Sequence, residues 1–271
     1  MSVRLDELTW VEVAEIIEQP NILILPVGST EQHAYHLPLN ADSCIVTYLS
    51  ERAAGEMNDR YAVRTLVAPT MNYTYVDDFK KFPGTIGLSI DTTTKVIEEI
   101  VCGLLTTGFT NILVINGHGP NALLIPPALK KVNLEYPDAG LYALSWWSLG
   151  REVVPKVMKS KMCLHAEEME TSICMVAEPD KVKIEKATSE YPSYSLSEKW
   201  ATPDFYGAGK YLLYHSRRKY PQMGKSPGVM GDATQANRET GERIIQAVVN
   251  DLVQLMQEII KSEGKSYRGE K

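Results

Sequence analysis

The sequence lacks the features that mark several large classes of protein. None of its four cysteines forms a C-x-x-C pair or another zinc-finger spacing, which favours free thiols in a reducing compartment. No apolar run approaches the roughly 18 residues of a membrane span, and the N-terminus is charged where a signal peptide is apolar. Lys and Arg together number 28 against 34 acidic residues, with no basic stripe. We therefore expect a cytoplasmic protein that binds neither nucleic acid nor membrane.

The composition is sufficient for a globular domain with a large core. Of the 271 residues, 44% are hydrophobic, and no repeat or linker divides the chain, so residues 1–271 are expected to form one domain. One stretch, 187–233, is rich in Ser, Tyr, Pro and Gly and has little apolar periodicity. Such long loops are usually functional, so it is predicted to cap the active site or to form an oligomer contact.

Strand and helix patterns alternate along the chain. Continuous aliphatic runs predict strands at 22–27, 63–68, 112–115 and 141–146. Helical spacing predicts helices at 8–18, 42–54, 92–108, 122–134 and 234–261. Thr9 and Asp232 are the expected caps of the first and last helices, and Gly55 is expected to interrupt the second. This alternation indicates an α/β domain with a mainly parallel sheet.

Carboxylate and imidazole side chains gather immediately after the first predicted strand. Glu31, His33, His36 and Asp42 lie within a dozen residues of one another. These groups are the ligands of catalytic divalent metals. Burying them unpaired is costly, and a divalent cation would offset that cost. This segment therefore predicts a metal site.

Two further segments bring more candidate groups. His118 follows the third predicted strand and is flanked by glycines, which allow a tight turn or a close approach to a ligand. The sequence HAEEMETS at 165–172 is also compatible with an exposed helix start, because acidic residues are favoured in a first turn. Ligands bind at the carboxyl ends of parallel strands, so the first two segments are expected to share a site. A nucleophilic Cys163, two residues before His165, remains an alternative.

Several motifs in the same order resemble the creatininase (creatinine amidohydrolase) family. They are PVGSTEQH at 26–33, HLPL at 36–39 with Asp42, FPGTIGL at 82–88, NGHGPN at 116–121, HAEEMETS at 165–172 and GVMGDAT at 228–234. The resemblance extends over nearly the whole chain. It implies a three-layer α/β/α fold and a hydrolase with two divalent metal ions, Zn or Mn, with Fe as a further option.

The resemblance also implies the metal ligands, which are Glu31, His33, Asp42, His118 and Glu168. Asp42 would bridge the two ions. Creatininase has a Glu two residues after its counterpart of His118, where this chain has Pro120. The resemblance to members with Gly-His-Gly therefore favours Glu168 as the second-metal ligand, with Glu170 supporting the loop from outside. The choice between Glu168 and Glu170 stays open at this point.

The expected catalytic residues are His165, as general acid/base, and Glu168. His165 would also face the substrate, with Trp146, Trp147 and Tyr35 as further substrate-binding candidates and Tyr73 as a weaker one. For the tryptophans, ordinary core packing is an equally good interpretation.

The predicted activity is hydrolysis of a cyclic amide or a similar small polar substrate. Alternatives within the resemblance are ring opening of a diketo-inositol at a C–C bond and deformylation of a formylaminopyrimidine. A phosphate substrate is disfavoured, because only Lys80 and Lys81 supply basic groups near the motifs. A peptide-processing or binding role in cofactor maturation is the alternative of another class. The resemblance also implies a homo-oligomer, a hexamer in related proteins.

Overall fold

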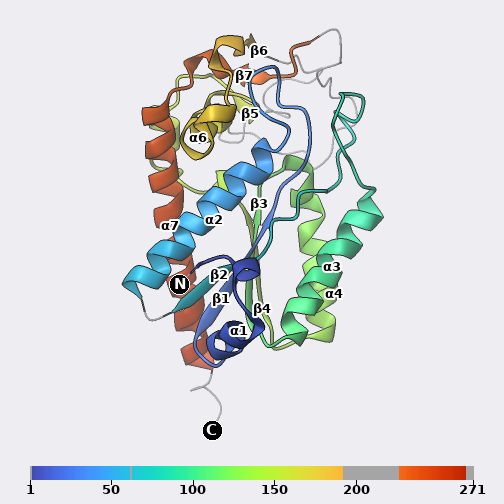
Figure 1. Cartoon of the computed structure of the whole chain (residues 1–271), viewed down its shortest axis with the longest axis vertical. Helices are drawn as coiled ribbons and strands as arrows, with labels where there is room; N and C mark the ends of the chain where they lie inside the picture. Colours follow the sequence, from blue (N-terminus) through green and yellow to red (C-terminus); the bar gives the residue numbers. More distant parts are fainter. Residues whose placement is uncertain (1, 62, 192–225, 267–271) are drawn as a thin grey trace.

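The computed structural model describes residues 2–61, 63–191 and 226–266 (Figure 1). Its centre is a four-stranded sheet in the order β2-β1-β3-β4. The strands are β1 (Asn21–Val27), β2 (Arg64–Val67), β3 (Asn111–Asn116) and β4 (Gly140–Ser145). Every neighbouring pair is parallel, with Leu23 opposite Leu66 on one side and Ile112 on the other. The predicted parallel sheet is confirmed.

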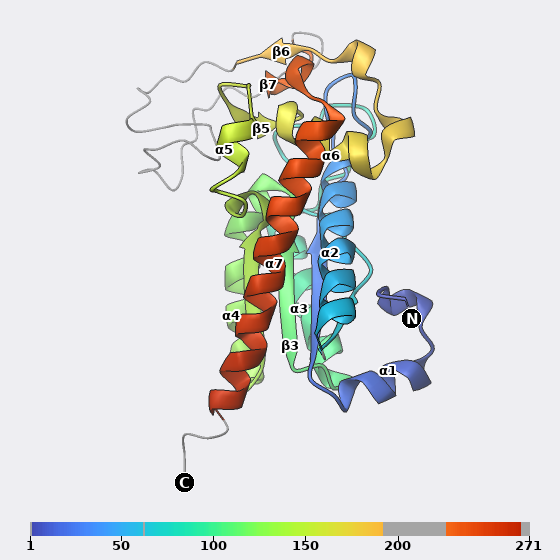
Figure 2. The same ribbon diagram turned by 90° about the vertical axis from the view of Figure 1, so that its left-hand side faces the viewer.

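Helices cover both faces of this sheet (Figures 1 and 2). On one face, α2 (Ala41–Arg60), α6 (Glu168–Ala177) and α7 (Arg238–Ser266) enclose a core that includes Ile22 and Ile24. On the other, α1 (Trp10–Ile17), α3 (Ile90–Thr106) and α4 (Ile125–Glu135) enclose a core that includes Leu23 and Leu25. Successive side chains of β1 thus enter opposite cores, which explains its continuous apolar run. The three-layer α/β/α fold is confirmed.

A second, small sheet lies beyond the carboxyl ends of the parallel strands (top of Figure 1). It is antiparallel, in the order β5-β7-β6, and comprises β5 (Cys163–His165), β6 (Ser189–Glu190) and β7 (Met230–Asp232). Strands of two or three residues leave no alternation to detect, so this sheet was not predicted. It pairs His165 with Met230 and so ties the third sequence motif to the GVMGDAT motif.

Short helices complete the described chain. They are α5 (Val154–Val157) and the 3-10 turns Leu5–Glu7, Gly119–Leu123, Trp146–Ser148, Pro179–Lys181, Ile184–Lys186 and Ala233–Gln235. Within the described ranges, no helix combines the length and apolarity needed to cross a membrane. Most of the 187–233 segment, residues 192–225, lies outside the described residues, and so does the cap or contact predicted there.

The helix ends confirm one predicted cap and correct two other predictions. Thr9 forms a capping box at the start of α1. Gly55 does not interrupt α2, which continues to Arg60 because tertiary packing outweighs the cost of one glycine. Asp232 caps the 3-10 turn at 233–235, whereas Asn237 accepts a hydrogen bond from the Thr240 N–H at the start of α7. That 3-10 turn delays the long helix to Arg238.

The strand order creates a switch point between β1 and β3. The chain leaves β1 toward α2 on one face, and it reaches β3 from α3 on the other face. Ligands of open α/β sheets bind in the crevice that such a reversal leaves at the strands' carboxyl ends. The loops that follow β1 and β3 carry Glu31, His33 and His118, so the fold brings these residues to one crevice.

Candidate metal centre

The loop after β1 folds back so that its acidic and imidazole side chains meet the first turn of α2. The Glu31 N–H donates to the Leu39 carbonyl across this loop. Gly28 is required where the loop passes the helix, since a Cβ there would lie 2.6 Å from the Cα of Ser43. Asp42 occupies the first turn of α2, where the helix dipole favours a carboxylate.

The loop after β3 brings His118 to the same place. A Cβ on Gly117 would lie 2.8 Å from the backbone oxygen of Asp42, so a glycine allows this approach. Gly119 faces open space and has no such steric role. Gly117 therefore allows the loop after β3 to approach the start of α2 closely, whereas Gly119 plays no part in this approach.

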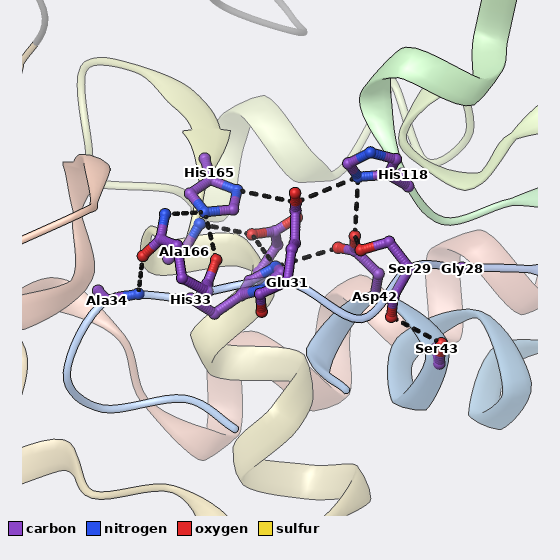
Figure 3. Close-up of polar contacts among 12 residues, drawn as sticks. Gly28, Ser29, Glu31, His33, Ala34, Asp42, Ser43, His118, His165 and Ala166 are labelled. Atoms are coloured by element: carbon purple, nitrogen blue, oxygen red, sulfur yellow. Dashed lines mark hydrogen bonds and ion pairs between the residues drawn. The ribbon is translucent and has the colours of Figure 1, made fainter. Parts of the chain in front are cut away.

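Asp42 lies at the centre of the cluster that results (Figure 3). Its Oδ1 is 3.1 Å from His33 Nε2, and its Oδ2 is 3.0 Å from His118 Nδ1. His118 Nδ1 is also 3.1 Å from Glu31 Oε1. His33 Nε2 is 3.8 Å from Glu170 Oε2. The two oxygens of the Asp42 carboxylate thus face two different groups of side chains that could bind a metal.

The residues that could donate a ligand atom to a metal form overlapping sets of three, called donor sets below. One set is Glu31, Asp42 and His118, and another is His33, Asp42 and Glu170. In each set, one donor atom per residue lies within 4.8 Å of the others, and all the residues are buried. A third set joins Glu31 and His33 to His165. Asp42 is shared by the first two sets, as a bridging carboxylate must be.

Backbone carbonyls orient both imidazoles of the cluster. His33 Nδ1 lies 3.2 Å from the Glu31 carbonyl oxygen, and His118 Nε2 lies 3.1 Å from that of Tyr75. A carbonyl only accepts, so each of these ring nitrogens carries a proton, and the other nitrogen of each ring faces the cluster, where it can bind a metal once it is deprotonated. Ser29 Oγ donates to Asp42 Oδ2 at 2.8 Å. The rings are therefore set for metal binding.

Glu170, and not Glu168, reaches this cluster, which corrects the sequence-based choice. The Glu168 carboxylate turns away and its Oε2 accepts from the backbone N–H groups of Lys159, at 2.8 Å, and Ser160, at 2.5 Å. Residues two apart on a helix point to nearly opposite sides, so Glu168 and Glu170 cannot face the same point. The sequence did not reveal which side of α6 faces the cluster.

The start of α6 holds Glu170 in place. Glu167 is the N-cap, and its carboxylate accepts from the backbone N–H groups of Met169, at 2.9 Å, and Glu170, at 3.3 Å. Glu170 Oε2 in turn accepts from the Ala166 N–H at 2.6 Å. Ala166 has a φ of 50°, an uncommon conformation for a residue with a side chain. The turn before α6 is thus shaped to aim one carboxylate at His33.

Burial and opposite charges shift the pKa values within the cluster. Burial lowers the pKa of His33, but Asp42, Glu170 and Glu31 together outweigh it and the result is about 10. The pKa of His118 also lies well above its usual value, because Glu31 and Asp42 overcome the effect of burial. Burial raises the pKa of Glu170 to about 7, against the effect of His33. These shifts show a buried excess of negative charge that attracts cations.

One atom of the cluster has no hydrogen-bond partner. Glu31 Oε2 is completely buried, and the described part of the chain supplies no donor to it. A buried carboxylate oxygen without a partner is costly, and a cation satisfies it. The cluster offers three carboxylates and two imidazoles, a donor set that suits Zn or Mn. The residues present therefore fit divalent metal binding.

His165 lies beside the cluster in an enclosed position. Its Nδ1 is 3.7 Å from Glu31 Oε1, and its ring centroid is 4.4 Å from that of His33. Phe79 stacks on its other side, with centroids 4.5 Å apart and an interplanar angle of 24°. Burial, and then His33, hold the pKa of His165 well below its usual value. A neutral imidazole thus faces the donors, and Phe79 is a neighbour that sequence reasoning missed.

His36 lies outside the cluster, although it belongs to the same motif. Its Nε2 is 2.8 Å from Thr171 Oγ1 on α6, and burial lowers its pKa to about 4. Cys163 also lies apart from the donors, and its thiol is a hydrogen-bond partner of the Glu167 carboxylate. Neither His36 nor Cys163 is placed to act on a substrate bound at the cluster.

The structure does not bring the aromatic candidates to the donor atoms. Trp146 is completely buried and Trp147 is 8% exposed, and both belong to the core between the sheet and α7. Their rings pack edge to face, with centroids 5.9 Å apart, so core packing explains both. Tyr35 and Tyr73 are at least half exposed. Lys80 forms an ion pair with Asp77, which reduces its attraction for a phosphate.

Comparison with known proteins gives relatives over nearly the whole chain. The sequence model for creatininase, creatinine amidohydrolase, matches residues 6–256. Creatinine amidohydrolase of Pseudomonas putida is 26% identical over 95% of this chain and 97% of its own. The 3-dehydro-scyllo-inosose hydrolase of Thermotoga maritima is 26% identical over 94% and 82%. A mycofactocin precursor peptide peptidase of Mycobacterium ulcerans is 30% identical over 86% and 83%.

Solved structures give the same result. A crystal structure of creatinine amidohydrolase (creatininase) matches with a TM-score of 0.78 at 26% identity, covering 95% of this chain and 98% of its own. A manganese form of creatininase matches with a TM-score of 0.76, and a mutant of Zn-Zn type with 0.78, each at 25% identity and covering 95% and 98%. With its donor cluster and its fold, this chain belongs to the creatininase family of hydrolases.

Proposed function

We propose that this chain hydrolyses a non-peptide C–N bond, such as a cyclic amide, in a small polar substrate. The observation that carries the proposal is the position of Asp42, whose two oxygens face two donor sets. One divalent cation would be held by Glu31, Asp42 and His118, and a second by His33, Asp42 and Glu170. Zn and Mn are the candidates, because creatininase structures of both kinds match this fold.

The chain's own residues supply the remaining requirements of such a reaction. A site of this kind, with divalent cations bound, would supply polarisation of a carbonyl and a lowered pKa of water. His165, neutral and 3.7 Å from Glu31, is placed to accept a proton at Nδ1 and to donate it to the leaving nitrogen. Phe79 covers the other face of the His165 ring and excludes water from it. Ser29 and the carbonyls of Glu31 and Tyr75 keep the donors oriented.

Creatinine itself is not the preferred substrate in this proposal. The Glu that creatininase has two residues after its counterpart of His118 is here Pro120, and Glu170 approaches His33 instead. This difference in the carboxylate beside the reacting atoms favours a substrate other than creatinine. The candidates are a different amide, a formamide, or ring opening at a C–C bond of an inosose-like substrate, the class named for the Thermotoga maritima relative. Peptide processing is a second candidate, supported by 30% identity to a peptidase of a cofactor precursor.

A metal and substrate screen tests the proposal. Purified protein is loaded with Zn or Mn, and four substrates are followed: creatinine, a formylaminopyrimidine, a cyclic diketone and a C-terminal peptide. We expect about two ions per chain and turnover of a substrate with a non-peptide C–N bond, abolished in Glu31→Gln. Turnover of the diketone alone would refute the C–N assignment. Glu168→Gln is the matched control, because its carboxylate lies outside the cluster. Metal-free protein, or activity that survives Glu31→Gln, would refute the proposal.

We also propose that the chain acts in the cytoplasm as a homo-oligomer, a hexamer by resemblance, and that residues 1–271 form one domain. The family match over 6–256 supports the single domain. Light scattering at several concentrations measures the assembly, and a monomer at every concentration would contradict it. Tyr35 and residues 187–233 stay candidates for substrate or subunit contacts.

A further inference from the structure

Gln32 lies between two proposed metal ligands, Glu31 and His33, and its side chain is 5% exposed. Its amide oxygen accepts from the Ala34 N–H at 2.9 Å. Its amide nitrogen donates to the Gly228 carbonyl at 3.0 Å. An N–H group cannot accept and a carbonyl cannot donate, so these contacts fix which end of the amide is oxygen and which is nitrogen. The second amide hydrogen remains free for another partner.

That partner is His165, which Gln32 meets twice at a single ring atom. His165 Nε2 lies 2.9 Å from the backbone oxygen of Gln32 and 2.9 Å from its amide nitrogen. The backbone oxygen only accepts, and the amide nitrogen only donates. A protonated Nε2 therefore bonds to the oxygen, and an unprotonated Nε2 bonds to the amide. The ring finds a partner in both cases without turning.

We propose that Gln32 is a positioning residue that gives His165 Nε2 a hydrogen-bond partner, in one ring orientation, whether or not that nitrogen carries the proton. This inference rests on the proposed function, in which His165 Nδ1 faces the reacting atoms. With the proton on Nε2, Nδ1 presents a lone pair beside Glu31 and accepts a proton. With the proton on Nδ1, the ring donates a hydrogen bond to a substrate oxygen or nitrogen. The amide of Gln32 stabilises the second form, which the backbone oxygen alone does not.

Gly228 makes room for this arrangement. Its φ is 92°, and a Cβ there would lie 2.2 Å from the amide oxygen of Gln32. The residue belongs to the GVMGDAT motif and precedes β7, which pairs with the strand that carries His165. Gln32 is thus held by the segment that leads into β7 and contacts the histidine on the neighbouring strand β5. Its side-chain amide and its backbone oxygen connect the loop of the candidate metal site to His165.

The test follows the ring nitrogens of His165 by 15N NMR in the zinc-bound protein. In the wild type, we expect chemical shifts between the limits of the two neutral forms. Gln32→Met keeps the length of the side chain but removes the donor, so the population ratio should move toward the Nε2–H form by about three- to tenfold, the usual effect of one neutral hydrogen bond. On a substrate, kcat should fall while KM changes little.

The matched control is Thr85→Val. Thr85 Oγ1 accepts from the backbone N–H of Gln32, so this change loosens the same loop but keeps both contacts to His165. We expect unchanged His165 shifts in this control. If Gln32→Met does not fold, Gln32→Leu also removes the amide donor and should show the same shift. Equal His165 shifts in the wild type and the Gln32 variants would overturn the inference.

The readout separates this inference from the proposed function. The NMR shifts require bound zinc and no turnover. A protein that binds zinc and responds to Gln32→Met, yet hydrolyses no substrate, would refute the proposed activity and keep the role of Gln32. A protein that hydrolyses a substrate but shows no change in the His165 shifts on Gln32→Met would keep the proposed activity and refute the role of Gln32.

Discussion

The candidate metal site, with His165 beside it, has two halves that are built on different kinds of structure. Glu31, Asp42 and His118 stand at the carboxyl ends of parallel strands and in the first turn of α2. Glu170 and His165 come from α6 and from a three-residue strand of the small antiparallel sheet. The strand ends fix the direction of the first group, whereas the second depends on the rotation of a short helix. The first half was therefore predictable, and the second required the structure.

The largest effect is expected at Asp42, the residue that the two sets of possible metal ligands share. Asp42→Ala removes a donor from both sets, so neither cation should stay bound and turnover should be lost. Removing a group that only hydrogen-bonds to a metal ligand lowers metal affinity by up to about 100-fold, and the loss in Asp42→Ala should be larger. Metal content after gel filtration measures it. If one ion remains at full affinity, Asp42 does not bridge.

The comparison between Glu170 and Glu168 separates the structure from the sequence-based choice. Glu170→Gln should lose one of the two ions, because its oxygen faces His33. Glu168→Gln should keep both ions and cost about 1–3 kcal/mol of unfolding free energy, since a charged acceptor of two backbone N–H groups becomes neutral. Metal analysis and urea unfolding distinguish the two variants. The reverse pattern would restore the original assignment of Glu168.

His165→Ala tests whether the second half contributes chemistry. His165 belongs to neither donor set that contains Asp42, so both ions should remain. Loss of general acid/base catalysis should lower kcat by about 100- to 10,000-fold. His36→Ala is the matched control, because that imidazole bonds to Thr171 outside the cluster. Equal losses in both variants would point to a structural cause.

Protonation gives opposite expectations for the metal-free and metal-bound states. In metal-free protein the pKa values of His33 and Glu170 are raised to about 10 and about 7. Their contributions to stability are complete below the unfolded pKa values and are lost as pH rises through the folded ones. Between pH 6 and 9 the Tm of metal-free protein should therefore fall, by at least about 2 °C. Zinc binds deprotonated donors, so the Tm increase caused by zinc should grow over the same range.

Calorimetry at several pH values, with chelator or with zinc, measures both trends. The lowered pKa values of Asp42, His36 and His165 act in the other direction, but only below the unfolded pKa values of these groups, at or below the acid end of this window. A metal-free Tm that rises between pH 6 and 9 would show that the buried carboxylates do not hold His33 protonated.

The smallest effect concerns the scaffold alone. Apart from the backbone of α2 itself and the residues next to Gly55, no atom of the described residues lies within 4 Å of a Cβ at Gly55, in the interior of α2. Gly55→Ala should therefore raise the unfolding free energy by about 0.5–1 kcal/mol, through the better helix propensity of Ala. Metal content should not change. Destabilisation would show that α2 needs flexibility at this point.

The sequence predicted the layers and most element boundaries because aliphatic runs report burial directly. Ile22 to Val27 had to be a strand buried on both faces, and the loop that followed it had to lie at a ligand site. Whether Glu168 or Glu170 faces the cluster was not predictable. The two side chains point to nearly opposite sides of α6, and the sequence does not show which side of this helix packs toward the cluster. The amide of Gln32 was missed for another reason: its partners, Gly228 and His165, are remote in sequence.

Anomalous diffraction from crystals grown with Zn or Mn tests the central claim most directly. The account predicts two peaks, one among Glu31, Asp42 and His118 and the other among His33, Asp42 and Glu170, with Asp42 between them. A single peak, or a second peak at Glu168, would contradict it.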